Sequence, residues 1–172
     1  MFIIEPCCTQ KQIPALRHKL GADGTTFFHG YGDLSLDEML PVLLTRYSEA
    51  DLMVVVPTLP NASAKVLKKL MERQWPTLDG KGRLNGIGHL TLLADLRKSK
   101  SPLASAWLEE NPFPGRLTLH SVQQNDTAVL LPDIALYGNM NFAYGGHFSG
   151  IATTRQRTIE DLRRMYLQLA NQ

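Results

Sequence analysis

Cysteine is nearly absent from this sequence: among 172 residues the only two cysteines are the adjacent Cys7 and Cys8. Neighbouring cysteines seldom form a disulfide, because the closed ring would force a strained peptide bond. The sequence has no C-x-x-C spacing, which excludes the usual cysteine frameworks for zinc and for redox chemistry. Two unpaired thiols are typical of a reducing compartment, so we expect a cytoplasmic protein.

Long apolar runs are also missing. Nowhere do about 18 apolar residues follow one another, the length that a membrane-spanning helix needs. The first twelve residues lack the apolar stretch of a signal peptide. The five histidines do not have metal-ligand spacing. We therefore expect no membrane association, no bound metal and no cofactor.

The sequence also lacks a strong excess of charge of either sign. The formal net charge is +2 and the isoelectric point about 8.6, which permits an acidic partner without arguing for one. The hydrophobic fraction of 44% is ordinary for a globular protein with a sizeable core. The length fits one domain, because domains commonly have roughly 100–200 residues. We expect residues 1–172 to form a single domain.

Apolar runs and helical periodicities alternate along the chain. Strands are predicted near residues 2–4, 25–29, 52–56, 88–96, 116–122, 127–131, 134–137 and 148–153. Helices are predicted near 12–20, after Ser35, after Asn61, from 102 to about 111, and over 158–169. This alternation indicates an α/β fold with a mixed, mostly parallel sheet flanked by helices. The unbroken runs at 52–56 and 90–93 predict adjacent, central strands buried on both faces.

Several helix ends have recognisable signals. Pro14 falls in the first turn of the first predicted helix, and Gly21 is placed to follow its end. Ser35 and Glu38 have the spacing of a capping box. Asn61 is predicted to cap the third helix, and Ser101, followed by Pro102, the fourth.

The segment Gly138-Asn139-Met140-Asn141, directly after a predicted strand, resembles the phospholipase D superfamily. In that family a strand leads into Gly-Ser-any-Asn. The order of strands and helices over residues 24–172 is also similar to that of the family's half-barrel, whereas residues 1–22 lie outside the resemblance as a strand-helix extension. The resemblance implies a phospholipase D-like half-barrel for residues 24–172.

The rest of the family's motif is replaced. The full pattern is His-any-Lys, four residues, Asp, six residues and then Gly-Ser-any-Asn. Counting back from Gly138 places Gln124 at the nucleophilic histidine and Asp126 at the lysine; Asn139 takes the place of serine, while Gly138 and Asn141 are kept. A carboxamide is not basic enough to attack phosphorus, and a carboxylate repels a phosphodiester. No lysine follows Lys100. We expect no catalytic residues and no phosphodiesterase activity.

Other residues are candidates for binding. Gln124, Asp126, Gly138, Asn139 and Asn141 are predicted to line the former active-site groove, and His120 and His147 are added as groove candidates or, in a rearranged site, as nucleophiles. A role for both histidines in structure alone is the simpler alternative. Two basic sets are candidate nucleic-acid contacts or ordinary solvated surface: Lys65, Lys68, Lys69 and Arg73 on one helix, and Arg97, Lys98 and Lys100 after a central strand.

Three functions remain open from the sequence. The first is a non-catalytic binding or scaffold module, the second a nucleic-acid binder that holds phosphodiesters without cleaving them, and the third a phosphodiesterase with a rearranged site. Relatives that encode one half-barrel pair two copies about a two-fold axis, so the resemblance also implies a homodimer. The alternative is that residues 1–22 cover the apolar seam.

Overall fold

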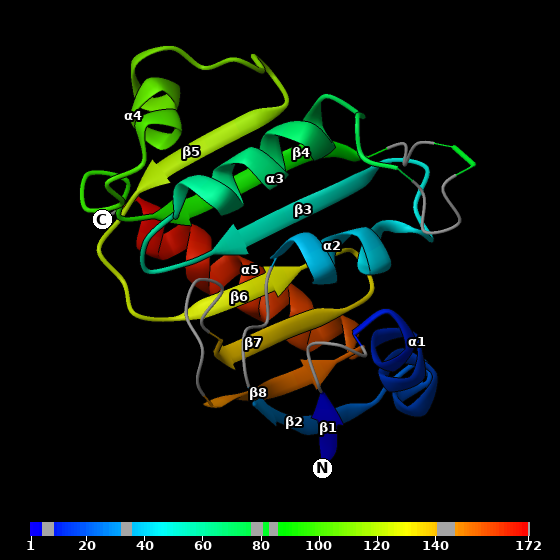
Figure 1. The fold of residues 1–172 in the computed structure, drawn as a ribbon. Helices are drawn as coiled ribbons and strands as arrows, with labels where there is room; N and C mark the ends of the chain where they lie inside the picture. The colour runs from blue at the N-terminus through cyan, green and yellow to red at the C-terminus, as the bar shows by residue number, and fades with distance from the viewer. Residues whose placement is uncertain (5–8, 32–35, 77–80, 83–85, 141–146, 172) are drawn as a thin grey trace.

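The structure, a computed structural model, describes residues 1–4, 9–31, 36–76, 81–82, 86–140 and 147–171. Eight strands and five helices alternate along these residues (Figure 1). The strands are β1 (Phe2–Ile4), β2 (Thr25–Tyr31), β3 (Ala50–Val55), β4 (Ile87–Ala94), β5 (Leu117–Ser121), β6 (Thr127–Leu130), β7 (Ala135–Asn139) and β8 (His147–Thr153). The helices are α1 (Thr9–Leu20), α2 (Leu36–Leu44), α3 (Asn61–Met71), α4 (Pro102–Glu109) and α5 (Gln156–Ala170).

All eight strands form one sheet in the order β1-β2-β8-β7-β6-β3-β4-β5. β1 pairs with β2, and β3 with β4 and β4 with β5, in parallel, whereas β6 and β8 are antiparallel to both of their neighbours. Six of the eight described strands therefore run in one direction. The predicted α/β fold with a mixed sheet is confirmed. The sheet is open, with β1 and β5 at its edges.

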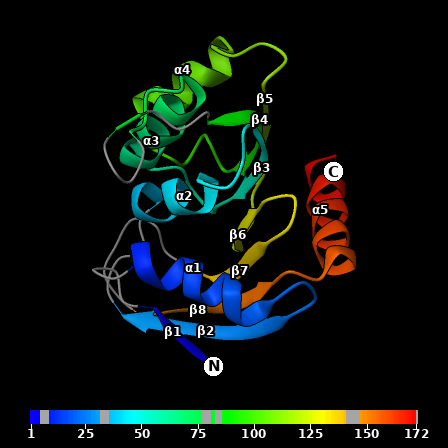
Figure 2. The same cartoon turned by 90° about the vertical axis from the view of Figure 1, so that its right-hand side faces the viewer.

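Helices cover both faces of the sheet. Helices α1 to α4 lie on one face and α5 lies on the other, as the two views together show (Figures 1 and 2). In the described parts of the chain, no helix is both long enough and apolar enough to cross a membrane.

Strand β3 joins two hydrophobic cores. Leu52 and Val54 belong to the large core under α1 to α4, while Met53 and Val55 belong to the smaller core under α5. Successive side chains of a strand point to opposite faces, so a strand covered on both sides must be apolar at every position. The run at 52–56 was predicted to be such a strand, and this prediction is confirmed: β3 and β4 are adjacent and neither is an edge strand.

Two of the predicted helix ends are confirmed. Gly21 follows α1 with a φ of +63°, and its N–H donates to the carbonyl of Arg17 at 3.2 Å. Such a left-handed residue at a helix end favours glycine. The Ser101 hydroxyl caps α4 by accepting the N–H of Ala104 at 3.2 Å. Ser35, predicted to cap α2, lies outside the described residues.

Two predictions about helix starts are wrong. α1 begins at Thr9, so Pro14 is inside the helix rather than in its first turn. Proline lacks an N–H, and the helix loses one backbone hydrogen bond there. Asn61 is the first residue of α3 and does not cap it; Pro60 precedes the helix without a side-chain cap. The side-chain carbonyl of Asn61 instead accepts the hydroxyl of Ser101 at 3.3 Å, an interaction across loops that local spacing does not reveal.

The described residues among 1–22, a range that lies outside the family resemblance, are part of the same sheet and core. β1 adds a strand beside β2. Ile13 and Leu16 of α1 are 2% and 0% exposed and pack in the large core. The extension is therefore needed to cover one end of the core.

Candidate functional site

At one end of the sheet lie Gln124, Asp126, Gly138 and Asn139, the described residues that the resemblance aligns with the family's motif. β3, β4, β5 and β7 all end there, and β6 begins there, because Thr127 pairs with Gly138. The segment from 122 to 126 crosses from the edge strand β5 to β6, which lie on either side of β3 and β4. In open α/β sheets ligands bind at the carboxyl ends of the parallel strands. We call this region the carboxyl-end site.

Hydrogen bonds hold together the loops that follow β3 and β4 at this end. The Ser99 hydroxyl donates to the Asp95 carbonyl and accepts the N–H of Leu59, both at 2.8 Å. The bond between Asn61 and Ser101 ties the starts of α3 and α4 together. These bonds give the site a fixed rim.

Gln124, at the position of the family's nucleophile, lies in the crossing segment. The residue is partly buried, and both polar atoms of its carboxamide are shielded from solvent without a hydrogen-bond partner among the described residues. An unpaired buried amide costs about 1–3 kcal/mol, so such groups are rare in folded proteins. The NH2 group and the carbonyl oxygen of Gln124 are thus hydrogen-bonding groups that the described fold leaves unused.

Asp126, at the position of the family's lysine, is exposed just before β6. It lies near the phenol of Tyr166 on α5. Burial of that phenol is the main cause that raises the pKa of Tyr166 to about 12, and the negative charge of Asp126 adds to it. The carboxylate therefore stands where the family places a cation, and it makes this part of the site less favourable for an anion.

Gly138 and Asn139 end strand β7. Gly138 has a φ of +147°, and a Cβ atom there would lie 2.5 Å from the Cα of Gly150 in β8. The close approach of the two strands therefore explains this glycine of the motif without a bound phosphate. Asn139 is exposed beside Ser149. Asn141 lies outside the described residues.

The two candidate histidines differ in position. His120 is half-buried on β5, and burial lowers the pKa of its imidazole. β5 is four strand spacings from β7, so about 19 Å separates the two strands. His120 is therefore not beside Gly138 and Asn139. His147 begins β8 and pairs with Tyr31, at the same end of the sheet as Asn139, but its side chain is outside the described part.

Much of the predicted basic helix face is already paired. Lys68 lies 3.8 Å from Glu72, Arg73 forms an ion pair with Glu49, and the Lys69 ammonium lies 5.9 Å from the centre of the Trp75 ring. Lys65 is exposed, and it has no ion-pair partner among the described residues. Within the described structure, Lys65 is thus the member of this set that is free to meet a ligand.

The second basic set lies beside the carboxyl-end site, in the loop between β4 and α4. Lys98 forms an ion pair with Asp95 at 3.2 Å, whereas Arg97 and Lys100 are exposed and without an ion pair in the described structure. Burial would raise the pKa of Asp95, but the N–H and ammonium of Lys98, with Arg97, hold that pKa below its usual value. Asp95 thus stays ionised and keeps the Lys98 ammonium in an ion pair, so Lys98 is less available to a ligand than Arg97 and Lys100.

Sequence reasoning missed the polar rim formed by Ser99, Ser101 and Asn61. The signal was present in part, because Ser99 and Ser101 come within a few residues after the central strand predicted near 88–96. Their partners could not be found, since they lie 40 residues away. The described residues include no cluster of three or more potential metal-ligating side chains.

Of the comparisons with known proteins, the one with solved structures finds a similar fold. No family model and no curated protein sequence matches the chain. Among solved structures, NucT from Helicobacter pylori, a phospholipase D-like nuclease, matches with a TM-score of 0.50 and 13% identity over 85% of this chain and 97% of that chain. TrmBL2, an archaeal chromatin protein with a DNA-binding mode described as novel, matches with a TM-score of 0.47 and 11% identity over 91% of this chain and 55% of its own. At these identities the likeness concerns the fold alone: this chain has an α/β fold similar to that of NucT.

Proposed function

We propose that this protein is a non-catalytic binding module that has kept a phospholipase D-like fold. The observation that supports it most is the pair Gln124 and Asp126 at the positions of the family's nucleophile and cation. Neither side chain supplies the chemistry of a phosphohistidine intermediate. What remains at the carboxyl-end site is a set of hydrogen-bonding groups, among them the unpaired carboxamide of Gln124.

Nucleic acid is the ligand class that we favour. Arg97, Lys100 and Lys65 supply positive charge without an ion pair in the described structure, in the loop after β4 and on α3, and phosphate contacts of this kind need no catalytic groups. The similar fold of NucT, a nuclease, supports the choice, because such a fold can present a phosphodiester-binding surface. The negative charge of Asp126 repels phosphates, so the nucleic-acid backbone is expected to pass at a distance from this residue.

Replacing Arg97 and Lys100 together by glutamine is expected to weaken binding of a fluorescein-labelled single-stranded DNA or RNA. Two lost phosphate contacts should reduce the slope of log K against log salt by about 1.4. Fluorescence anisotropy at several salt concentrations measures both quantities. The matched control replaces Lys19 and Arg157, which lie near the other end of the sheet, and should leave the slope unchanged. No binding by the unaltered protein at low salt would exclude nucleic acid and leave a protein or small-molecule ligand for the module.

We also propose that two copies pair through the carboxyl-end site, so that Gln124, Asp126 and Asn139 of both chains line one groove. Half-barrels of the family pair in this way about a two-fold axis. In such a dimer, Asn139→Asp adds two like charges close to the two Asp126 carboxylates.

Light scattering of the full chain is expected to give the mass of a dimer. Asn139→Asp should shift it toward the monomer, and more strongly at low salt, because the repulsion is electrostatic. Asp161→Asn on the exposed face of α5 serves as the control and should not change the mass. A monomer for the unaltered chain at all accessible concentrations would refute the pairing.

A further inference from the structure

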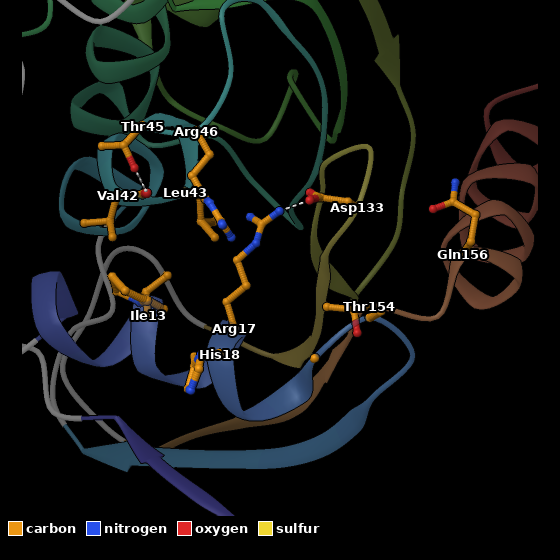
Figure 3. A pocket seen from close by; sticks show the side chains of 13 residues that line it. Ile13, Arg17, His18, Val42, Leu43, Thr45, Arg46, Asp133, Thr154 and Gln156 are labelled. Carbon is orange, nitrogen blue, oxygen red and sulfur yellow. Dashed lines mark hydrogen bonds and ion pairs between the residues drawn. The ribbon is translucent and has the colours of Figure 1, made fainter.

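A cavity with both charged and apolar walls lies at the end of the sheet opposite the carboxyl-end site. Its volume is about 830 Å³, and α1, α2, the turn between β6 and β7, and the junction of β8 with α5 enclose it (Figure 3). Asp133 is in the turn of the β6–β7 hairpin, next to the pair formed by Leu130 and Ala135. Gly138 lies at the opposite end of this hairpin, so the cavity and the carboxyl-end site are at opposite ends of the sheet. The volume is within the range of about 300–1,000 Å³ that is usual for small-molecule sites.

Arg17 of α1 supplies a positive charge whose position in the cavity is fixed by its contacts. Its side chain is only 11% exposed. Its Nη2 atom donates to the Tyr47 hydroxyl at 3.2 Å and forms an ion pair with Asp133, and Tyr47 in turn donates to Asp133. The guanidinium lies 5.7 Å from the centre of the Tyr47 ring. A guanidinium has five N–H donors, and those on Nε and Nη1 have no partner among the described residues. The fold therefore holds Arg17 in place and leaves part of its donor set unused.

Arg46, just after α2, adds a second guanidinium. Figure 3 shows Arg46 and Arg17 reaching into the cavity from different walls and toward one another. Arg46 is exposed and has no ion-pair partner in the described structure. Asp133 is the one carboxylate among the described lining residues, so it offsets one of the two guanidinium charges, that of its ion-pair partner Arg17. The cavity therefore has an excess of positive charge.

The remaining wall is apolar. Ile13 of α1 and Val42 and Leu43 of α2 line it, and all three are nearly fully buried. A bare inorganic ion would leave most of the cavity empty. A ligand that fits therefore has an anionic end for the arginines and an organic part for the wall.

We propose that this cavity binds a small organic phosphate monoester, with its phosphate between Arg17 and Arg46. A phosphate has three acceptor oxygens and a charge of about −1.5 to −2, so it can accept from two guanidinium groups at once. A carboxylate, with two oxygens and one charge, compensates less well for the repulsion by Asp133. Arg17 and the apolar Ile13 come from residues 1–22, so the site depends on the extension as well as on the region that resembles the phospholipase D family.

Calorimetric titration of the full chain with phenyl phosphate tests the proposal. We expect saturable binding at one site, tighter than that of inorganic phosphate because the phenyl ring contacts the apolar wall. Arg46→Gln should weaken phenyl phosphate binding at least about 10-fold, the effect of one lost charge-assisted hydrogen bond. Asp133→Asn should strengthen it, because the repelling charge is removed while the size of the side chain is kept. Circular dichroism confirms that each variant is folded.

Arg157→Gln is the matched control: it removes an exposed arginine of α5 that does not line the cavity, and it should leave binding unchanged. Absence of saturable binding up to about 10 mM phenyl phosphate would overturn the proposal. Equal losses in the Arg46 and Arg157 variants would also overturn it, since they would indicate general attraction to a basic surface. Inorganic phosphate binding as tightly as phenyl phosphate would refute the organic part of the ligand. None of these outcomes bears on the carboxyl-end site, which lies at the other end of the sheet.

Discussion

Gly138→Ala is expected to destabilise the protein by about 3–5 kcal/mol. The added Cβ would lie 2.5 Å from the Cα of Gly150 and 2.6 Å from the carbonyl oxygen of Ser149. Both atoms belong to the backbone of β8 and cannot turn aside, so β7 and β8 would have to separate. The φ of +147° adds strain for any residue with a side chain. Urea unfolding followed by circular dichroism measures the loss.

Gly115→Ala separates the two causes. Gly115 also has a positive φ, of +75°, but no described heavy atom lies within 4 Å of the position that the added methyl group would take. Its loss should therefore be only the conformational cost, about 1–2 kcal/mol. If Gly138→Ala costs no more than Gly115→Ala, the close contact between the strands does not limit this position, and the structural explanation of the motif's glycine fails.

Phe28→Ala is expected to cost about 3–5 kcal/mol, the range for a buried phenylalanine. Phe28 is 1% exposed and its ring centre lies 6.5 Å from that of Phe148. Gly150 makes room for this ring, because a Cβ there would come within 2.7 Å of it. The truncation would leave a cavity beside β2 and β8 that the fixed backbone cannot fill.

The neighbouring Phe27 provides the control. It lies on the same strand, points to the other face and is 67% exposed. Phe27→Ala should change the free energy of unfolding by no more than about 0.5 kcal/mol. A large loss for Phe27→Ala together with a small loss for Phe28→Ala would mean that β2 is shifted by one residue from the register in which Phe28 pairs with Gly150.

The sequence allowed the fold to be predicted where one local rule decided the structure. The run at 52–56 is apolar at every position because Leu52 and Val54 face one core while Met53 and Val55 face the other. Ser101 followed by Pro102 marks a helix start through a bond over three residues. The apolar periodicity of Ile13, Leu16 and Leu20 places the start of α1 near residue 12, whereas the helix begins at Thr9 and tolerates Pro14 one turn further in.

The candidate sites could be predicted only in part. The spacing of the motif predicts that Gln124 and Asp126 share a groove with Gly138 and Asn139, and this stays a prediction. The shielding of the Gln124 amide could not be predicted, because it depends on how the crossing segment packs. The cavity lined by Arg17 and Arg46 left no sequence signal at all. Arg17 and Asp133 are 116 residues apart, and they meet only because α1 packs beside α2 and the β6–β7 turn. Side chains whose partners are set by tertiary packing cannot be paired from local spacing.

Hydrolysis of bis-p-nitrophenyl phosphate tests most directly whether the fold has lost its phosphodiesterase chemistry. Release of p-nitrophenolate is measured for the purified full chain and, in parallel, for His120→Ala and His147→Ala, the two histidines proposed for a rearranged site. A weak signal that persists in both variants indicates a co-purifying hydrolase. We expect no release above that of buffer, because Gln124 cannot attack phosphorus and Asp126 repels the substrate. Turnover by the unaltered protein that either histidine variant abolishes would contradict the loss of this chemistry.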